Sequence, residues 1–318
     1  MTLLSSLSSR SPLAGIVLVA LSFPLFTTMD TLVKWLSGSY SVAQIILLNT
    51  IFGHMTVMLF LSVRRGGWAS IRTRRLPLHL LRGSIGIAGG FSAFWAFSHL
   101  PLADVYATLF TAPLMITLLS IPIAGESVGW RRGLAVVVGF IGVLIMLRPG
   151  QGVFHLAALG GLGGALTHAL SMLIVRRMAG HEGGLSFAFY SNTASLFWSG
   201  LIVATVTGFE PPPLSDLLLH AASGGCGSLG LMAITLGFAR APAAVLAPFQ
   251  YTQMIWGVLF GYGVWGDVPD LWLVAGAAVV IGSGLYVVRR EARLQRTGPS
   301  SSDGSSPGSS ASSSGSSG

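Results

Sequence analysis

Three ionisable side chains lie in or beside long apolar stretches, where such groups are expensive and usually functional. Asp30 and Lys34 stand four residues apart in the stretch from 13 to 36, and Asp104 follows the turn at Leu100-Pro101. An acid four residues before a base favours an ion pair within one helix, so Asp30 and Lys34 could simply neutralise each other. The alternative is that Asp30 or Asp104 carries a coupled proton or binds an amine.

Other polar and aromatic residues gather at similar depths in the apolar stretches. Polar groups there can bond across helices for about 0.6 kcal/mol on average, but their concentration predicts a lined cavity. Four aromatic residues at helical spacing, Phe91, Phe94, Trp95 and Phe97, could add a wall for an aromatic solute, although core packing or lipid contact is the alternative for each. The candidates are Thr27, Phe91, Phe94, Trp95, Tyr106, Thr111, His168, Gln250, Tyr251 and Gln253.

Prolines divide several of these stretches. Pro24, Pro113 and Pro248 each remove a backbone donor from a helix, which is tolerable where protein or a wet cavity receives the freed carbonyl. Pro101 and Pro242 lie in turns between apolar stretches. We expect these five prolines to act as gates or hinges, with a static kink as the alternative.

Metal and cofactor chemistry has no support in the sequence. The seven histidines form no His-x-x-x-His pattern, and Cys226 is the single cysteine. Paired carboxylates and nucleophile-base sets are also missing, so we predict no metal, no cofactor and no enzyme activity. A Ser-His pair assembled by folding, which would make an intramembrane enzyme, stays a remote alternative.

The composition identifies the elements that must position these residues. Of the 318 residues, 52% are hydrophobic and 9% are charged, against about 25% charged in a soluble domain. A membrane-spanning helix needs about 20 apolar residues. The sequence therefore predicts an all-α polytopic membrane protein with ten spans, at 13–36, 41–62, 79–99, 102–122, 130–147, 156–176, 185–207, 215–238, 243–264 and 270–288.

The formal charge of +8 reflects membrane topology rather than nucleic-acid binding. With the N-terminus inside, 16 of the 18 basic residues fall in cytoplasmic segments, and only Lys34 and Arg148 fall outside. The positive-inside rule then places both termini in the cytoplasm. Arg82 and His79 could attract a solute carboxylate at the cytoplasmic mouth, but we favour extension of Arg82 to the lipid headgroups. The bilayer is the expected partner, and we expect a monomer or weak dimer.

The two ends of the chain differ from the spans. Arg10 and the apolar run after it resemble a secretory signal, but no small-residue cleavage site follows, so we interpret the run as the first span. The boundaries that we predict are a cytoplasmic N-terminus at 1–12, five-helix repeats at 13–150 and 151–290, and a disordered Ser/Gly-rich tail at 291–318.

An internal repeat relates the two halves. A shift of 141 residues places Leu100-Pro101-Leu102-Ala103 on Ala241-Pro242-Ala243-Ala244 and Gly125-Glu126 on Gly266-Asp267. Each half has five spans, an odd number, so the second half must be inserted upside down. Inverted repeats are typical of transporters that alternate access around a central cavity.

The sequence resembles the drug/metabolite transporter superfamily in its ten-helix EamA form. The resemblance is carried by residues 96–103, 123–126 and 139–146, and by their second-half echoes at 238–242, 266–267 and 281–282. Asp267 stands where that family usually shows Glu. Within the superfamily, the chain is most similar to the YddG-type exporters of aromatic and other neutral amino acids.

The resemblance implies a transporter in the bacterial inner membrane that exports neutral and aromatic amino acids by alternating access. Another small solute, such as S-adenosylmethionine, riboflavin or a cationic drug, is the alternative within transport. A sensor that transports nothing is a third class. Phosphorylated solutes are disfavoured, because no basic residue lies near the predicted bilayer centre.

Overall fold

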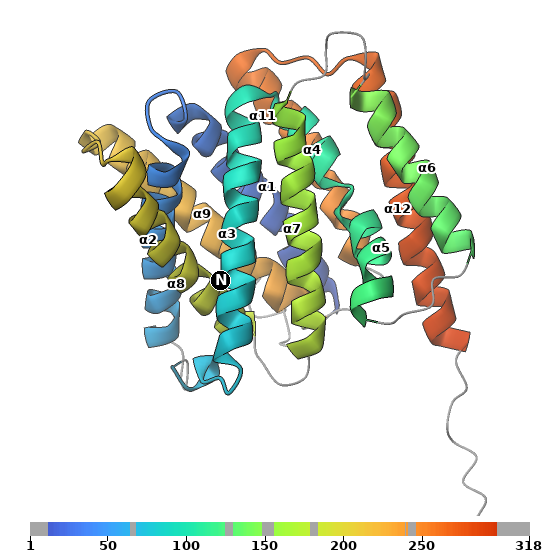
Figure 1. Cartoon of the computed structure of the whole chain (residues 1–318), viewed down its shortest axis with the longest axis horizontal. Coiled ribbons are helices and arrows are strands. Elements are labelled where there is room, and N and C mark those ends of the chain that lie inside the picture. Colours follow the sequence, from blue (N-terminus) through green and yellow to red (C-terminus); the bar gives the residue numbers. More distant parts are fainter. Residues whose placement is uncertain are drawn as a thin grey trace, which may run out of the picture.

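The structure is a computed structural model that describes residues 12–63, 68–124, 130–147, 156–178, 184–238, 240 and 246–297. All regular elements in these ranges are helices (Figure 1). The first half contains α1 (Pro12–Leu36), α2 (Val42–Val63), η1 (Trp68–Ile71), α3 (Leu76–His99), α4 (Leu102–Leu109), α5 (Ala112–Ala124) and α6 (Trp130–Leu147). The second half contains α7 (Ala157–Met178), α8 (Gly184–Ile202), η2 (Val203–Thr207), α9 (Leu214–Phe238), η3 (Ala247–Tyr251), α11 (Thr252–Trp265) and α12 (Leu271–Thr297).

These helices coincide with the ten predicted spans in the part of the chain that is described. Six stretches are long and apolar enough to cross a membrane, and they lie in α1, α2, α3, α4 with α5, α7 and α9. Shorter apolar helices occupy 133–146 and 271–286. The protein is therefore an all-α polytopic membrane protein, as the apolar runs predict.

The spans that contain Pro113 and Pro248 are interrupted. α4 ends at Leu109, and Pro113 is the second residue of α5, a position where its missing N–H would be unbonded in any case. Pro248 lies in the first turn of η3, directly before α11. Both interruptions occur at corresponding places in the two halves.

The other predicted hinge prolines behave differently. α1 continues through Pro24, whose carbonyl accepts a hydrogen bond from the Thr28 hydroxyl at 2.8 Å. Pro101 is the residue before α4, and its φ of -55° suits the start of a helix. Pro242 lies outside the described residues. Hinge motion at any of these prolines remains a prediction.

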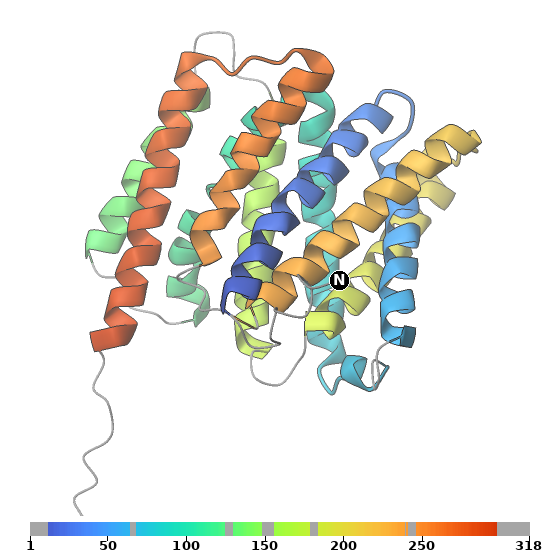
Figure 2. The ribbon, with the colours of Figure 1, turned by 180° about the vertical axis from the view of Figure 1, so that it is seen from behind.

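The packing of the helices follows the inverted repeat. α1 packs most extensively on α9, and α7, its counterpart in the second half, packs on α3 to almost the same extent. The counterparts α6 and α12 pack on each other, as do α2 and α8. Figure 1 shows the α6–α12 pair on one side of the bundle and α2 with α8 on the other. Figure 2, the view from behind, shows α1 next to α9. These exchanged partners are those that a twofold relation between the halves requires.

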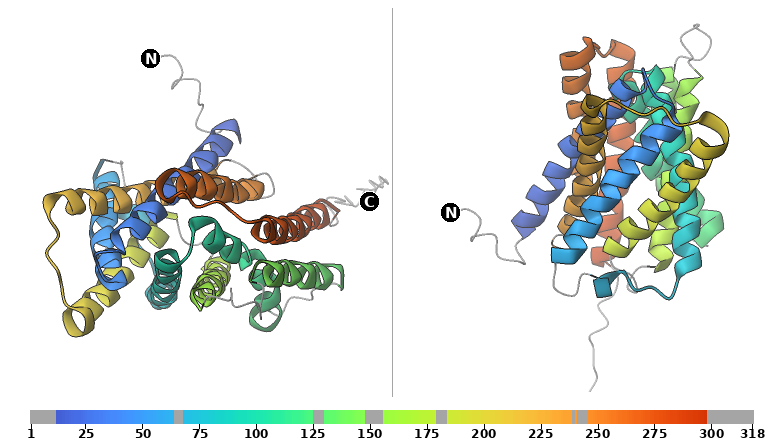
Figure 3. Two further views of the ribbon diagram at one scale, coloured as in Figure 1. Left: turned by 90° about the horizontal axis from the view of Figure 1, so that it is seen from above. Right: turned by 90° about the vertical axis from the view of Figure 1, so that its left-hand side faces the viewer.

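The two ends of the bundle carry different loops. We call the end with residues 37–41, 100–101 and 266–270 the Lys34 end, at the top of Figure 1, and the opposite end the Arg82 end. Figure 3 shows the bundle from above the Lys34 end and from the α2 side. The described basic residues, apart from Lys34, gather toward the Arg82 end, which is the end we predict to be cytoplasmic. They include Arg72, Arg74, Arg75, Arg131, Arg177, Arg240 and Arg289.

The C-terminal helix is longer than expected. α12 continues to Thr297, so residues 291–297, which we placed in the disordered tail, are helical. The sequence Glu-Ala-Arg-Leu-Gln-Arg in this segment consists of strong helix formers, which explains the extension. Residues 298–318 and 1–11 lie outside the described ranges.

Candidate functional site

Four of the predicted site residues meet in one buried polar cluster. The Tyr106 hydroxyl of α4 donates a hydrogen bond to Asp30 Oδ2 of α1 at 2.7 Å. Thr27 of α1 and Gln253 of α11 are further hydrogen-bond partners of Tyr106. Tyr106 and Thr27 have no exposed surface, and Asp30 is 4% exposed. We call these four residues the Asp30 cluster.

Local sequence explains how the cluster forms. Thr27 and Asp30 are three residues apart and so lie on neighbouring positions of one helix face. Gly257 of α11 lies against the Tyr106 ring, and any side chain at that position would clash with it. Phe97 of α3 packs edge-on against the same ring, with 5.6 Å between the ring centroids. The cluster therefore joins α1 and α4 of the first half to α11 of the second.

The expected ion pair between Asp30 and Lys34 does not form. Lys34 Nζ instead contacts Asp267 Oδ2 at 3.0 Å and lies 4.4 Å from the centre of the Trp265 ring. The intrahelical interpretation is therefore wrong, because the loop after α11 brings a carboxylate and an aromatic face to the end of α1. Among the described residues, Asp30 has no cationic group within ion-pair distance.

The remaining polar candidates lie around the two interruptions or away from the cluster. Thr111 is fully buried at the break between α4 and α5. Tyr251 packs edge-on against Phe110 at the same break, with ring centroids 5.3 Å apart, and Gln250 is half-buried beside it. Asp104 lines a small cavity of about 100 Å³ at the Lys34 end, together with Asp267 and Asp270. Proton coupling by Asp30 or Asp104 remains a prediction.

The aromatic candidates on α3 differ in their surroundings. Phe97 contacts Tyr106, and Trp95, two residues earlier, projects to nearly the opposite face of the helix. Trp95 packs instead near Gly160 of α7 and makes a tilted ring contact with His99, with the ring centroids 5.2 Å apart. Phe94 packs both on the apolar cluster of Val33, Leu36 and Ile45 and on the cluster that contains Phe97 and Tyr106. Phe91 is half-buried. The aromatic rings in the core around Tyr106 therefore include Phe94 as well as Phe97, Phe110 and Tyr251.

Arg82 was expected to extend to the lipid headgroups, but its side chain turns toward α8 instead. Its guanidinium donates hydrogen bonds to the Ser191 hydroxyl and the Phe187 carbonyl of α8, and it lies over the Phe187 ring. His168 of α7 is close enough for an electrostatic interaction with it. This second polar group lies nearer the Arg82 end than the Asp30 cluster does.

A further buried network was missed by the sequence analysis. His220 Nδ1 lies 3.0 Å from Asn49 Oδ1, and the Asn49 amide donates to the Ser223 hydroxyl at 2.8 Å. The Ser223 hydroxyl in turn donates to the Met29 carbonyl at 3.3 Å. Nothing in the spacing of these residues signals the network, because it joins three helices that are far apart in the sequence. It ties α1, α2 and α9 together.

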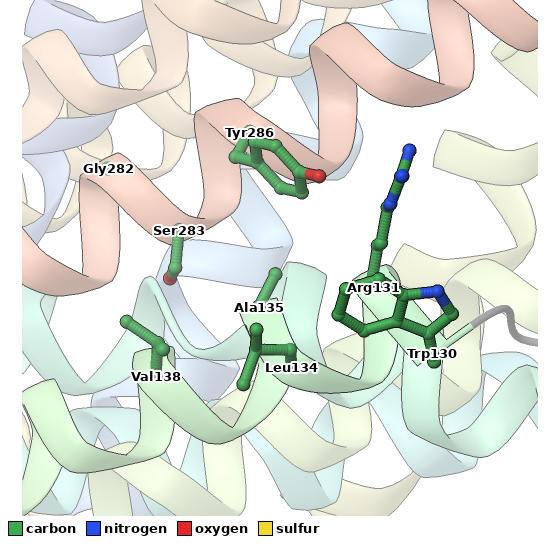
Figure 4. A pocket seen from close by; sticks show the side chains of 8 residues that line it. All are labelled: Trp130, Arg131, Leu134, Ala135, Val138, Gly282, Ser283 and Tyr286. Carbon is green, nitrogen blue, oxygen red and sulfur yellow. The ribbon is translucent and has the colours of Figure 1, made fainter.

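A pocket of about 400 Å³ lies between α6 and α12, away from all these groups. Figure 4 shows Ala135 and Val138 of α6 facing Gly282 and Ser283 of α12, with Tyr286 and Trp130 at its rim. Trp130 is 73% exposed, and none of the predicted site residues lines this space. Apart from Arg131, Ser283 and the Tyr286 hydroxyl, its lining is apolar, which is typical of a lipid-facing groove, so we do not assign the solute to it.

The comparisons with known proteins agree with the two halves. The chain matches the EamA-like transporter family over residues 13–148 and 155–289. One crystal structure superposes with a TM-score of 0.62 at 18% identity, covering 88% of this chain and 98% of that chain. At this identity the similarity shows the fold alone.

The curated relatives are transporters of different solutes. An S-adenosylmethionine uptake transporter of Rickettsia bellii is 25% identical over 279 residues, which cover 88% of this chain and 94% of that protein. The pseudopaline exporter CntI of Pseudomonas aeruginosa is 26% identical over 275 residues, covering 84% and 93%. A riboflavin transporter of Vibrio cholerae is 31% identical over 230 residues, covering 71% and 76%. These names support transport rather than enzyme activity, and they leave the solute open.

Proposed function

We propose that this chain, which belongs to the EamA-like transporter family, carries a small amine-bearing metabolite across the bacterial inner membrane by alternating access. The observation that carries the proposal is the buried contact between Asp30 and Tyr106, at the place where α1 and α4 meet α11 of the other half. Both termini would lie in the cytoplasm, as the clustering of basic residues at the Arg82 end favours.

A carboxylate in this position is suited to an ammonium group. Asp30 is buried within a membrane span, and no described cation neutralises it. An ammonium group of the solute would supply that charge and replace hydrogen bonds that the carboxylate loses on leaving water. The faces of Phe97, Phe110 and Tyr251, which pack around the cluster, could receive the same cation or an aromatic side chain.

Neutral and aromatic amino acids remain our first candidate solutes, with export as the direction. S-adenosylmethionine is the next candidate, because it also carries an α-amino acid group and because a relative is named for its uptake. Riboflavin is favoured by a different observation, the 31% identity to a riboflavin transporter. Riboflavin has no ammonium group, so its transport would not need the Asp30 carboxylate.

Alternating access follows from the inverted halves. Two half-structures of the same kind can exchange their conformations, so that an inward-open and an outward-open state have similar energies. The Asp30 cluster touches both halves, and a rearrangement between them would therefore alter the site. The interruptions at Pro113 and Pro248 would then act as hinges beside that site.

Counterflow in proteoliposomes tests the proposal. Vesicles loaded with unlabelled solute are given labelled phenylalanine, tryptophan, S-adenosylmethionine or riboflavin, with and without a proton gradient. We expect uptake of an amine-bearing solute, and a loss of tenfold or more in the Asp30→Asn variant, because an amide cannot pair with an ammonium group. Asp270→Asn is the control, since it removes a carboxyl elsewhere while keeping a residue that can cap α12.

The outcome separates the candidate solutes. Uptake of riboflavin alone, unchanged by Asp30→Asn, would replace the amine-bearing class by the second candidate. Absence of uptake for the whole panel would contradict the proposed solute class. A response to the proton gradient that Asp30→Asn removes would assign coupling to Asp30.

A further inference from the structure

Arg82 is a transmembrane cation whose hydrogen-bonding capacity is only partly used. One nitrogen, Nη1, donates to Ser191 Oγ at 2.5 Å and to the Phe187 carbonyl at 3.3 Å. The buried Nε has no hydrogen-bond partner. No described carboxylate lies within ion-pair distance of the guanidinium, whereas Lys34 pairs with Asp267. A guanidinium in this situation retains donors suited to an anion.

The face of α3 next to Arg82 borders an open part of the interior. His79, Gly86 and Ala93 are spaced seven apart and share one face of the helix. His79 is buried, and Ala93 packs on the apolar core, so this face points into the protein. Gly86 is nevertheless exposed, and a Cβ there would meet nothing within 4 Å. Solvent therefore reaches the interior one turn above Arg82.

α7 borders the same space from the other side. Gly161 contacts Thr108 of α4, and His168, seven residues later, shares that inward face. His168 is exposed there, although Leu159 and Leu166 occupy the outer face of the helix. Thr167 lies directly against Gly89 of α3. His168 and the region of Gly86 therefore face one another across neighbouring helices.

We propose that Arg82, held by Ser191 and accompanied by His168, binds the carboxylate of the transported solute in the half of the bundle toward the Arg82 end. This site rests on the transport function proposed above. A planar guanidinium can donate two parallel hydrogen bonds to a carboxylate, and His168 can donate a third. The bound anion would also supply the negative partner that Arg82 lacks among the described residues.

The site is separate from the Asp30 cluster. Asp30 lies 18 residues after the start of α1, and Arg82 lies six residues after the start of α3, and both helices start at the Arg82 end. At 1.5 Å per residue, this places the two residues roughly 18 Å apart in depth. The ammonium and carboxylate groups of one amino acid are only a few bonds apart. A small amino acid would therefore occupy the two sites in succession.

Two probes that each carry one of the charges test this assignment. N-acetylphenylalanine has the carboxylate without the ammonium group, and phenylalaninamide has the ammonium group without the carboxylate. Their binding is measured by calorimetry on the purified full chain in detergent. We expect Arg82→Gln to weaken N-acetylphenylalanine about tenfold or more, as for loss of a charge-assisted hydrogen bond, and to leave phenylalaninamide unchanged. Asp30→Asn should have the opposite pattern.

Because the two variants should weaken different probes, the experiment distinguishes a failure of the Arg82 site from a failure of the proposed function. Unchanged binding of N-acetylphenylalanine to Arg82→Gln, or no binding of it to the unaltered chain, would overturn the Arg82 site while leaving the Asp30 site standing. If the unaltered chain bound N-acetylphenylalanine but not phenylalaninamide, the result would count against the proposed amine class instead. Glycerol 3-phosphate provides the lipid-headgroup arm, and stronger binding of it than of N-acetylphenylalanine would also overturn the carboxylate assignment.

Two further variants apply if Arg82→Gln does not fold. Ser191→Ala removes the hydroxyl that accepts a hydrogen bond from the guanidinium, and His168→Gln removes the neighbouring ring. Each should weaken N-acetylphenylalanine a few fold without weakening phenylalaninamide. Equal weakening of both probes, or of neither, would show that these residues only support the packing of α3, α7 and α8 and would overturn the site.

Discussion

The Lys34 end and the Arg82 end both join the two halves, but they do so with different chemistry. At the Lys34 end, Lys34 meets Asp267, and the Tyr40 hydroxyl donates to Asp216 Oδ2 at 2.7 Å. At the Arg82 end, cations meet neutral oxygens. Arg177 donates to the Ile123 carbonyl, Arg75 donates to the Arg177 carbonyl, and Arg82 donates to Ser191 and Phe187.

This difference indicates which end is held closed. Contacts between a charge and a carboxylate are stronger than contacts between a charge and a neutral carbonyl, particularly where water is partly excluded. The side chain of Lys34 is only 15% exposed, and a cation-π contact with Trp265 adds to its pairing. We therefore predict that this conformation is held closed at the Lys34 end and is accessible near Gly86 and His168.

The largest effect is expected from reversing the charge of Lys34. Lys34→Glu places two carboxylates where an ion pair of 3.0 Å now stands, and their repulsion should keep the Lys34 end from closing. Counterflow should fall at least tenfold. The double variant Lys34→Glu with Asp267→Lys should restore most of the rate. A double variant as slow as the single one would show that the pair does not hold this end closed.

The accessible interior gives the next prediction. In a background with Cys226→Ala, a cysteine at Gly86 should react with a membrane-impermeant thiol reagent from the Arg82 side, since nothing fills the space beside that residue. A cysteine at the buried Ala103, toward the Lys34 end, should react at least about tenfold more slowly because it is only 6% exposed. Equal labelling of both positions from both sides would contradict the difference between the ends.

The smallest effect concerns Tyr40, which lies in the loop between α1 and α2. Its hydrogen bond to Asp216 raises the pKa of the Tyr40 hydroxyl from 10.0 to about 12. The raised value means that this contact stabilises the fold fully below pH 10 and is lost as the pH rises to about 12. Tyr40→Phe should therefore lower the Tm slightly at pH 8 and have less effect at pH 12. An equal effect at both pH values would show that the stabilisation does not depend on the protonated Tyr40 hydroxyl.

Much of the fold could be predicted from the sequence, because each apolar run is a local signal. The ten spans, the interruptions at Pro113 and Pro248 and the inverted halves all follow from such signals. The helical extension of α12 to Thr297 was missed, because we began the Ser/Gly-rich tail at residue 291, before the Ser/Gly-rich composition starts. Thr27, Tyr106 and Gln253 were predicted to line one cavity, but Asp30 was not linked with them.

The site could be predicted only in part, and the errors share a cause. Trp95 and Phe97 look equivalent as aromatic residues on one helix, yet a two-residue difference places them on opposite faces, and only Phe97 contacts Tyr106. A cavity wall therefore cannot be assigned before the neighbours of each helix face are known. The same holds for Arg82, whose side chain could extend to the headgroups or into the bundle.

The sequence by itself determined that the chain crosses the membrane, where it does so, and that its halves are inverted. Periodicity, apolar length and the placement of basic residues are properties of the chain alone. Only the tertiary structure decided that Asp30 meets Tyr106, that Lys34 meets Asp267 across 233 residues, and that Arg82 lacks a described carboxylate partner. Charges in a membrane take partners from whichever helix is nearest in space, and that proximity depends on packing rather than on spacing along the chain.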